Sequence, residues 1–216
     1  MSIRRRILVA STNPGKLKEI REMLGGEIDW VGLSDFPGIG EIEEDGKTFA
    51  ENARKKANGY AGATGLWTLA DDSGLVVDAL GGEPGVKSAR FAESHRRERR
   101  ERRDLLDKKN IEKLLSMLKD VPKEKRTARF VCCLCLASPQ KVLVETIGTL
   151  EGLIIDEPAG VNGFGYDPVF FVPKLNKTVA QLSSVEKNAI SHRGDAIRKL
   201  KLLLGDIFKT ETTKRP

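Results

Sequence analysis

Cysteine is scarce in this sequence: 216 residues contain three, and these cluster at Cys132, Cys133 and Cys135. So few cysteines argue against a small scaffold held together by disulfides. Cys132 and Cys135 form a C-x-x-C pattern, but they lie in an apolar, strand-like run, where residues three apart face opposite sides. Because no second cysteine pair completes a zinc site, we interpret all three as buried structural thiols.

Long hydrophobic runs are also missing. Residues 130–137 form one of the longest runs, far short of the roughly 20 apolar residues that cross a bilayer. The apolar segment at residues 7–10 is shorter than the core of a signal peptide, and a lysine-rich segment follows it. We therefore expect a cytoplasmic protein without a membrane partner.

Aromatic residues make up only 6% of the chain, and none interrupts its most basic segment, residues 96–103. This run holds six arginines and two glutamates, so it carries +4 of the total net charge of +6. A nucleic-acid surface usually combines basic residues with aromatic side chains that stack on bases. The run therefore favours a solvated helix, with a contact to a polyanion or another subunit as the alternative.

Hydrophobic patterning predicts strands and helices in mixed order along the chain. The expected strands are residues 7–10, 66–70, 129–136 and 141–149, with residues 28–33 as a further candidate. The expected helices are residues 14–24, 48–63, 105–118 and 188–204, with Ser191 as a candidate cap at an internal start of the last one. The last two strands form a hairpin, which argues against a purely parallel sheet. No repeat or linker interrupts the pattern, so we expect one α/β domain over residues 1–208 and a polar C-terminal tail over residues 209–216.

The first strand leads into the turn Ser11-Thr-Asn-Pro-Gly-Lys16 at the start of a helix. Backbone N–H groups and the positive end of the helix dipole point out of such a turn, and Lys16 adds a full charge, so the segment suits phosphate. It is not a Walker A loop, because Ala10 stands at the first glycine position and Leu17 follows the lysine. Taken alone, a plain strand-to-helix turn explains the segment equally well.

Two acidic segments could bind a metal ion. The strand of residues 66–70 is expected to end at Asp71-Asp-Ser-Gly74, and buried carboxylates are costly unless they bind a metal or a base. Carboxylate oxygens suit Mg²⁺, and because adjacent strand residues point opposite ways, only one of Asp71 and Asp72 is expected to face the site. The acidic loop of residues 41–48 could supply a second carboxylate, although a solvated charge cluster explains it better on its own.

Two later segments could bind a nucleobase. Gly163-Phe-Gly-Tyr-Asp-Pro168 sets two aromatic residues among glycines that permit close approach, so a ring could stack on a base or pack in a turn. Residues 187–193 place Lys187, His192 and Arg193 at a helix start, where positive charge is unfavourable without an acceptor ligand. Arg193 could donate two hydrogen bonds in one plane to such a ligand.

Together these segments resemble the Ham1/RdgB family of inosine triphosphate pyrophosphatases. The matches follow the family order from residue 7 to about residue 204, nearly the whole chain. They are residues 11–16, 71–85, 88–91, 126–130, 163–168 and 191–193. The joint match is specific, although no single segment is.

The resemblance implies a two-lobed α/β fold with a long mixed β-sheet flanked by helices and a central cleft, and it implies a homodimer. It also implies hydrolysis of non-standard purine nucleoside triphosphates, such as ITP, dITP and XTP. Water attacks the α-phosphorus, and the products are the monophosphate and pyrophosphate. Mg²⁺ is the implied cofactor.

The resemblance also assigns roles by motif position. Asp72 is implied as the general base and, with Glu44, as a metal ligand, while Lys16 is implied in catalysis as a charge that neutralises phosphate. Phosphate binding is implied for Ser11, Thr12, Asn13, Pro14, Gly15, Lys16 and Ser73. Purine binding is implied for Phe164, Gly165, Tyr166, Asp167, Lys187, His192 and Arg193.

Two features depart from the family pattern. Ala180-Gln-Leu182 stands where Ala-Glu-Leu is typical, which removes a carboxylate, and the arginine run of residues 96–103 is not a family feature. A pyrophosphatase for modified pyrimidine nucleotides is a second interpretation of the chain. A nucleic-acid-binding module that acts through residues 96–103 is a third.

Overall fold

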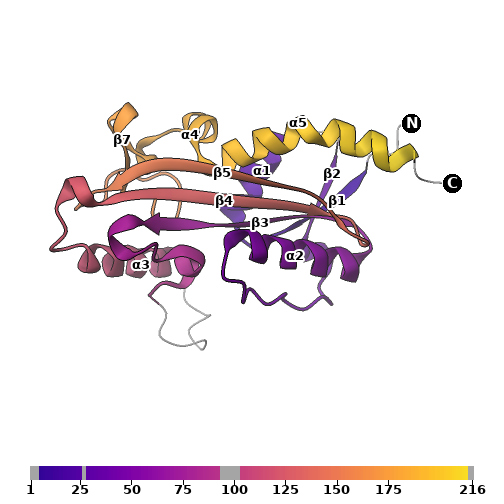
Figure 1. Cartoon of the computed structure of the whole chain (residues 1–216), viewed down its shortest axis with the longest axis horizontal. Helices are drawn as coiled ribbons and strands as arrows, with labels where there is room; N and C mark the ends of the chain where they lie inside the picture. Colours follow the sequence, from indigo (N-terminus) through magenta and orange to yellow (C-terminus); the bar gives the residue numbers. More distant parts are fainter. Residues whose placement is uncertain (1–4, 26–27, 93–102, 214–216) are drawn as a thin grey trace. The chain divides into compact units, whose positions relative to one another are not determined.

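The computed structural model describes residues 5–25, 28–92 and 103–213 (Figure 1). The chain forms two compact units. Unit 1 consists of Met1–Asp72, Cys132–Gly148 and His192–Pro216, and unit 2 consists of Ser73–Val131 and Thr149–Ser191. The seven strands in the described part of the chain form one mixed sheet in the order β2-β1-β3-β4-β5-β6-β7. Three of these strands contribute residues to both units: β3 (Trp67–Val77), β4 (Thr127–Ala137) and β5 (Val142–Ile154).

Unit 1 is built on parallel strands covered by helices. β1 (Arg6–Ala10) pairs in parallel with β2 (Asp29–Gly32) and with the first half of β3. Because β1 is covered on both sides, Ile7, Leu8, Val9 and Ala10 are all buried, as expected for a parallel strand. The strands of unit 1 lie between α2 (Phe49–Thr64) on one side and α5 (His192–Thr213) on the other, and α1 (Pro14–Leu24) packs against α5 (Figure 1).

Unit 2 adds antiparallel strands. β6 (Phe170–Val172) pairs with β5 and with β7 (Lys177–Thr178), while α3 (Arg103–Met117) and α4 (Ser184–Ile190) flank the strands (Figure 1). Its core contains the stacked rings of Phe130 and Phe170, with centroids 4.3 Å apart. Ile111 and Leu114 on α3, together with Leu118 directly after the helix, complete this core.

The expectation of a mixed α/β fold with a hairpin in the second half is confirmed. Ser138 donates its backbone N–H to the Lys141 carbonyl (2.8 Å) at the turn of that hairpin. All three cysteines are buried free thiols. No described helix is long and apolar enough to cross a membrane. Of the arginine run, residues 96–102 lie outside the described residues.

Three element boundaries differ from the sequence-based expectation. β3 does not end at Asp71 but continues to Val77, because pairing with a neighbouring strand overrides the local turn signal of Asp-Asp-Ser-Gly. The last helical segment begins at Ser184 rather than residue 188; Ser191 has extended backbone angles (φ −67°, ψ 155°) and separates α4 from α5, in agreement with the internal start expected there. α5 also runs to Thr213, well into residues 209–216, which were expected to form a tail.

Candidate active site

The turn after β1 is organised by Asn13, which caps α1. Asn13 Oδ1 accepts hydrogen bonds from the N–H groups of Gly15 (2.9 Å) and Lys16 (3.3 Å), and Ser11 Oγ accepts one from the Asn13 N–H (3.1 Å). Pro14 occupies the start of the helix, as expected. Because these three N–H groups are engaged within the turn, its attraction for an anion depends mainly on Lys16 and the helix dipole.

Asp71 lies at the centre of a buried ion-pair network in unit 1. Its side chain accepts hydrogen bonds from Lys16 Nζ (2.5 Å) and Arg193 Nε (2.7 Å), and the Cys132 thiol lies 3.2 Å from Oδ2. Burial alone would raise the pKa of Asp71, but the charges of Arg193 and Lys16 hold it well below its ordinary value of 3.8. Asp71 is therefore an ionised anchor for two cationic side chains.

Arg193 joins three elements of unit 1. It is 1% exposed, and besides its bond to Asp71 on β3 it donates from Nη1 to Glu19 on α1. Burial alone would lower its pKa, but the carboxylates of Asp71 and Glu19 raise it. Arg193 thus fixes α1, which carries Lys16, against β3. The neighbouring His192 is also buried.

Asp72 has a different environment from its neighbour. It is 6% exposed, Oδ1 lies 3.5 Å from Lys56 Nζ, and Oδ2 is buried with no hydrogen-bond partner among the described residues. Burial raises the pKa of Asp72 above its ordinary value of 3.8, because it outweighs the attraction of Lys56 and Lys16. A carboxylate with a raised pKa, one of whose oxygens accepts no hydrogen bond from the described residues, is suited to accept a proton.

Lys56 brings the acidic loop and β3 together. Its Nζ atom, on α2, lies 2.8 Å from Glu44 Oε1, 2.8 Å from the Asp71 carbonyl oxygen and 3.5 Å from Asp72 Oδ1. Burial alone would lower the pKa of Lys56, but Asp72 and Glu44 raise it above its ordinary value of 10.5. One ammonium group therefore sits beside both carboxylates that the sequence proposed as metal ligands.

A second cluster lies within unit 2. Asp167 Oδ2 accepts hydrogen bonds from the Phe164 N–H (2.9 Å) and from Lys187 Nζ (2.7 Å), and Lys187 Nζ lies 4.4 Å from the centroid of the Phe164 ring. Asp167 and Lys187 are buried, whereas Phe164 is half-buried. Gly163 has a positive φ of 80°, and a Cβ there would collide with Asp167 Oδ2, so the loop requires glycine at this position.

The two aromatic residues of this loop have different surroundings. Tyr166 is 4% exposed, packs in the core of unit 2 and donates its hydroxyl to the Ser88 carbonyl (2.9 Å). Gly165 lies between the two aromatic residues, and its N–H donates to the side chain of Asp107 on α3 (2.8 Å). Phe164 is therefore the ring of this loop that is suited to stacking, and Tyr166 anchors the loop.

Comparison with known proteins identifies the family. A model described as the Ham1 family matches residues 7–203. The chain belongs to the Ham1 family. It is 50% identical over 201 residues to a dITP/XTP pyrophosphatase of Geobacter sulfurreducens, covering 93% of this chain and 96% of that protein. It is also 46% identical over 214 residues to a dITP/XTP pyrophosphatase of Bacillus cereus, covering 98% of this chain and all of that protein.

Solved Ham1 structures support the same fold. The Ham1 proteins of Staphylococcus aureus and Coxiella burnetii each superpose with a TM-score of 0.81 at 41% identity, covering 94% of this chain and 99% of theirs. The family resemblance seen in the sequence is thereby confirmed.

The residues of this Ham1 protein fit Mg²⁺ only together with a ligand. Glu44 and Asp72 lie beside one common cation, the Lys56 ammonium, and Asp72 Oδ2 is an oxygen that accepts no hydrogen bond from the described residues. No described group of three or more His, Cys, Asp or Glu side chains is placed to hold a metal ion. Mg²⁺ is commonly held by one or two carboxylates plus phosphate oxygens, which matches this pair.

Sequence reasoning missed Lys56, although a signal was present. Lys56 lies in the buried stripe of α2 with Ala53, Ala57 and Tyr60, where a charged residue is unusual without a partner. The acidic loop immediately before the helix supplied a candidate for that partner in Glu44.

Gln181, the departure from the family pattern, has a clear local role. Its Oε1 accepts the Thr178 N–H (2.8 Å) and completes a capping box at the turn Val179–Gln181. An amide oxygen performs this capping as well as a carboxylate does, so the missing charge leaves the turn intact.

Proposed function

We propose that this Ham1 protein hydrolyses ITP, dITP and XTP to the nucleoside monophosphate and pyrophosphate. The observation that carries the proposal is the environment of Asp72, a buried carboxylate with a raised pKa and one oxygen unengaged by the described residues, beside Lys56. Its relatives named dITP/XTP pyrophosphatase supply the substrate class.

In this proposal, water attacks the α-phosphorus, its proton passes to Asp72, and the bond from the α-phosphorus to the bridging oxygen breaks so that pyrophosphate leaves. Lys16 and Lys56 neutralise phosphate charge, which is the main requirement in phosphoryl chemistry. Glu44 and Asp72 would hold Mg²⁺, which supplies further charge neutralisation on the phosphates. The turn of residues 11–16 and Ser73 bind phosphate oxygens.

Base selection is assigned to the second cluster. Phe164 stacks on the purine, and Asp167 and Lys187 lie at its edge. Hypoxanthine and xanthine present a 6-oxo acceptor where adenine presents an amino donor. A hydrogen-bond donor of the protein can therefore pair with hypoxanthine or xanthine, whereas adenine leaves it unpaired. Rejection of this kind reaches about 10⁴-fold.

The test is product analysis with Mg²⁺ over a panel of ITP, dITP, XTP, ATP, GTP and modified pyrimidine triphosphates. We expect monophosphate and pyrophosphate from the first three. Free phosphate as the sole product, or ATP cleaved as fast as ITP, would refute the proposal. A preference for modified pyrimidines, or steeply salt-dependent nucleic-acid binding without hydrolysis, would support the other two interpretations.

We further propose that the protein is a cytoplasmic homodimer. Sedimentation equilibrium of the purified protein tests the stoichiometry, and a single species at the mass of one chain would contradict it.

A further inference from the structure

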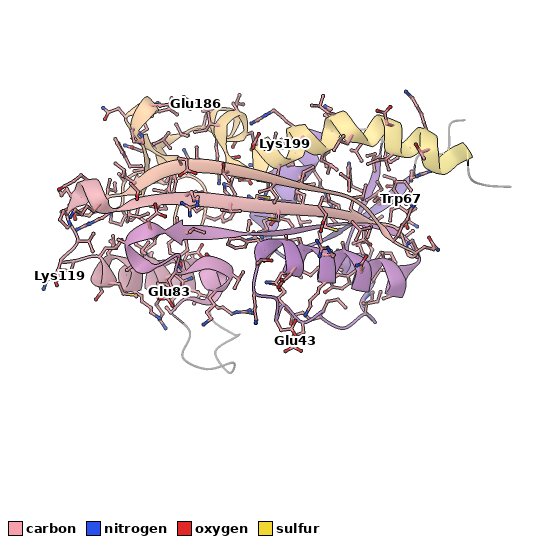
Figure 2. All side chains as sticks on the ribbon, in the orientation of Figure 1. Glu43, Trp67, Glu83, Lys119, Glu186 and Lys199 are labelled. Atoms are coloured by element: carbon pink, nitrogen blue, oxygen red, sulfur yellow. The ribbon has the colours of Figure 1, made fainter. Side chains whose placement is uncertain are left out.

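The acidic loop before α2 alternates between two environments. Ile42, Glu44 and Gly46 are half-buried, whereas the odd-numbered residues between them are exposed. Glu43, labelled in Figure 2, lies at the outer edge of the loop. A period of two is the pattern of an extended segment that lays one side against a surface.

That surface is α2, and the contacts are regularly spaced. The Ile42 N–H donates to the Tyr60 hydroxyl (3.3 Å), Glu44 Oε1 lies 2.8 Å from Lys56 Nζ, and the Gly46 N–H donates to Asn52 Oδ1 (2.8 Å). Every second residue of the loop thus contacts every fourth residue of α2. The loop runs antiparallel to the helix, since the loop numbers rise from 42 to 46 as the helix numbers fall from 60 to 52. We call these three contacts the ladder.

The spacing of the ladder follows from backbone geometry. Two residues of extended chain span about 6.6 Å. Four residues of α-helix rise about 6.0 Å, and positions 52, 56 and 60 share one face. The loop can therefore follow the helix over three consecutive contacts with little distortion.

The outer contacts of the ladder depend on particular residues. Asn52 is fully buried, and its Nδ2 has no hydrogen-bond partner among the described residues, so its one hydrogen bond to the loop must offset that burial. A Cβ on Gly46 would lie 2.6 Å from Asn52 Oδ1, so a larger residue would push the loop away. At the other end, Ile42 packs over Gly59, where a Cβ would lie 2.8 Å from Ile42 Cδ1.

We propose that Asn52 and Tyr60 are positioning residues, which hold the loop along α2 so that Glu44 stays beside Lys56 and Asp72. Each accepts a backbone N–H two residues from Glu44, one on either side, so together they fix the main chain that carries this carboxylate. The inference rests on the proposed function, because it gives Glu44 its role toward Mg²⁺.

The chain offers a matched control for this proposal. Lys55 is on the same helix and pairs with Asp45 of the same loop, but the two side chains are about half-exposed. Exposed ion pairs contribute little to stability. Lys55→Ala should therefore leave the loop docked, whereas Tyr60→Phe and Asn52→Leu each remove one acceptor of the ladder. Phenylalanine keeps the ring of tyrosine, and leucine fills the space of asparagine with a somewhat larger apolar group.

The first measurement is amide hydrogen exchange by NMR, without metal or substrate. We expect exchange at Ile42 in Tyr60→Phe and at Gly46 in Asn52→Leu to rise about fivefold, as for loss of one hydrogen bond. Asn52→Asp, which retains the acceptor oxygen, should restore protection at Gly46, and Lys55→Ala should change neither amide. If both amides exchange in the wild type at unstructured-chain rates, or if a variant raises exchange equally throughout unit 1, the positioning role is refuted.

The second measurement is the Mg²⁺ dependence of ITP hydrolysis. A less populated docked loop weakens apparent affinity, so half-saturation by Mg²⁺ should rise at least twofold in Tyr60→Phe and Asn52→Leu, while kcat at saturating Mg²⁺ recovers. A loosened loop with unchanged Mg²⁺ half-saturation would overturn the inference. A wild-type protein that cleaves no triphosphate would instead overturn the proposed function, and amide exchange would still decide whether the ladder holds the loop.

Discussion

Replacing each of the two neighbouring aspartates by asparagine should give opposite results. The two substitutions are the same chemical change at adjacent positions of β3. Asp71 carries the ion pairs to Lys16 and Arg193, whereas Asp72 has one oxygen without a partner among the described residues. Asp71→Asn should therefore affect mainly stability, and Asp72→Asn should affect mainly catalysis.

The magnitude for Asp71→Asn follows from burial. The Asp71 side chain is fully buried and the Arg193 side chain is 2% exposed, so the substitution leaves a buried guanidinium with a weaker partner. Removing one partner of a buried pair costs about 3–5 kcal/mol. For a chain of this size, 1 kcal/mol corresponds to about 2–4 °C, so the melting temperature should fall by about 6–20 °C.

Asp72→Asn should have the opposite signature. Because burial raises the pKa of Asp72, its ionised form is disfavoured in the folded protein, and a neutral amide relieves that penalty. The melting temperature should stay unchanged or rise. Loss of a general base lowers the rate of hydrolysis by about 10²–10⁴-fold.

Calorimetry measures the melting temperature of both variants, and steady-state hydrolysis of ITP measures their activity. Equal losses of melting temperature would show that Asp72 is as much a structural anchor as Asp71. Full activity in Asp72→Asn would refute its assignment as the general base, whatever its stability.

The remaining predictions concern pH, the base and the capping turn. Because the base must be ionised, the acid limb of kcat/KM in the wild type should be missing from the residual activity of Asp72→Asn. A limb retained in the variant would assign it to another group. Because the pKa of Asp71 is lowered in the folded protein, the ionised carboxylate contributes stability above pH 3.8, and this contribution is lost as the pH falls through the folded pKa. Acid unfolding of Asp71→Asn should lack this contribution. Identical acid unfolding curves for the wild type and the variant would contradict the prediction. Phe164→Ala should raise KM for ITP about tenfold, with a smaller change in kcat, since base stacking contributes about 1–3 kcal/mol; an unchanged KM would remove the stacking role. Gln181→Glu should leave the melting temperature and the activity unchanged because it keeps the capping oxygen. Gln181→Ala should lose about 1 kcal/mol of stability. Equal melting temperatures of the two variants would show that the cap is unimportant.

The start of the chain could be predicted because its signals are local. Asn13 and Pro14 define the beginning of α1 within two residues, and Gly25 follows its end. The capping oxygen, the fixed φ of proline and the freedom of glycine act over a single turn of helix, so no knowledge of the rest of the fold is needed. The same holds for the hairpin turn at Ser138.

The path of β3 could not be predicted in the same way. Asp71-Asp-Ser-Gly74 has the composition of a turn, yet it forms the middle of a strand. The cations that make Asp71 tolerable in that strand are Lys16 and Arg193, 55 and 122 residues away in sequence. A local pattern carries no information about such distant partners, and so the boundary after residue 70 was wrong.

The alternation of side chains along a strand did predict that the two aspartates would differ, but not how. Both residues lie in β3, and both side chains are buried. The closeness of the cations separates them: Lys16 and Arg193 lie 2.5 and 2.7 Å from oxygens of Asp71, whereas Lys56 lies 3.5 Å from Asp72 and also contacts Glu44. The same desolvation is therefore overcome at Asp71 and dominates at Asp72, which separates an ionised anchor from the proposed proton acceptor without any difference in residue type.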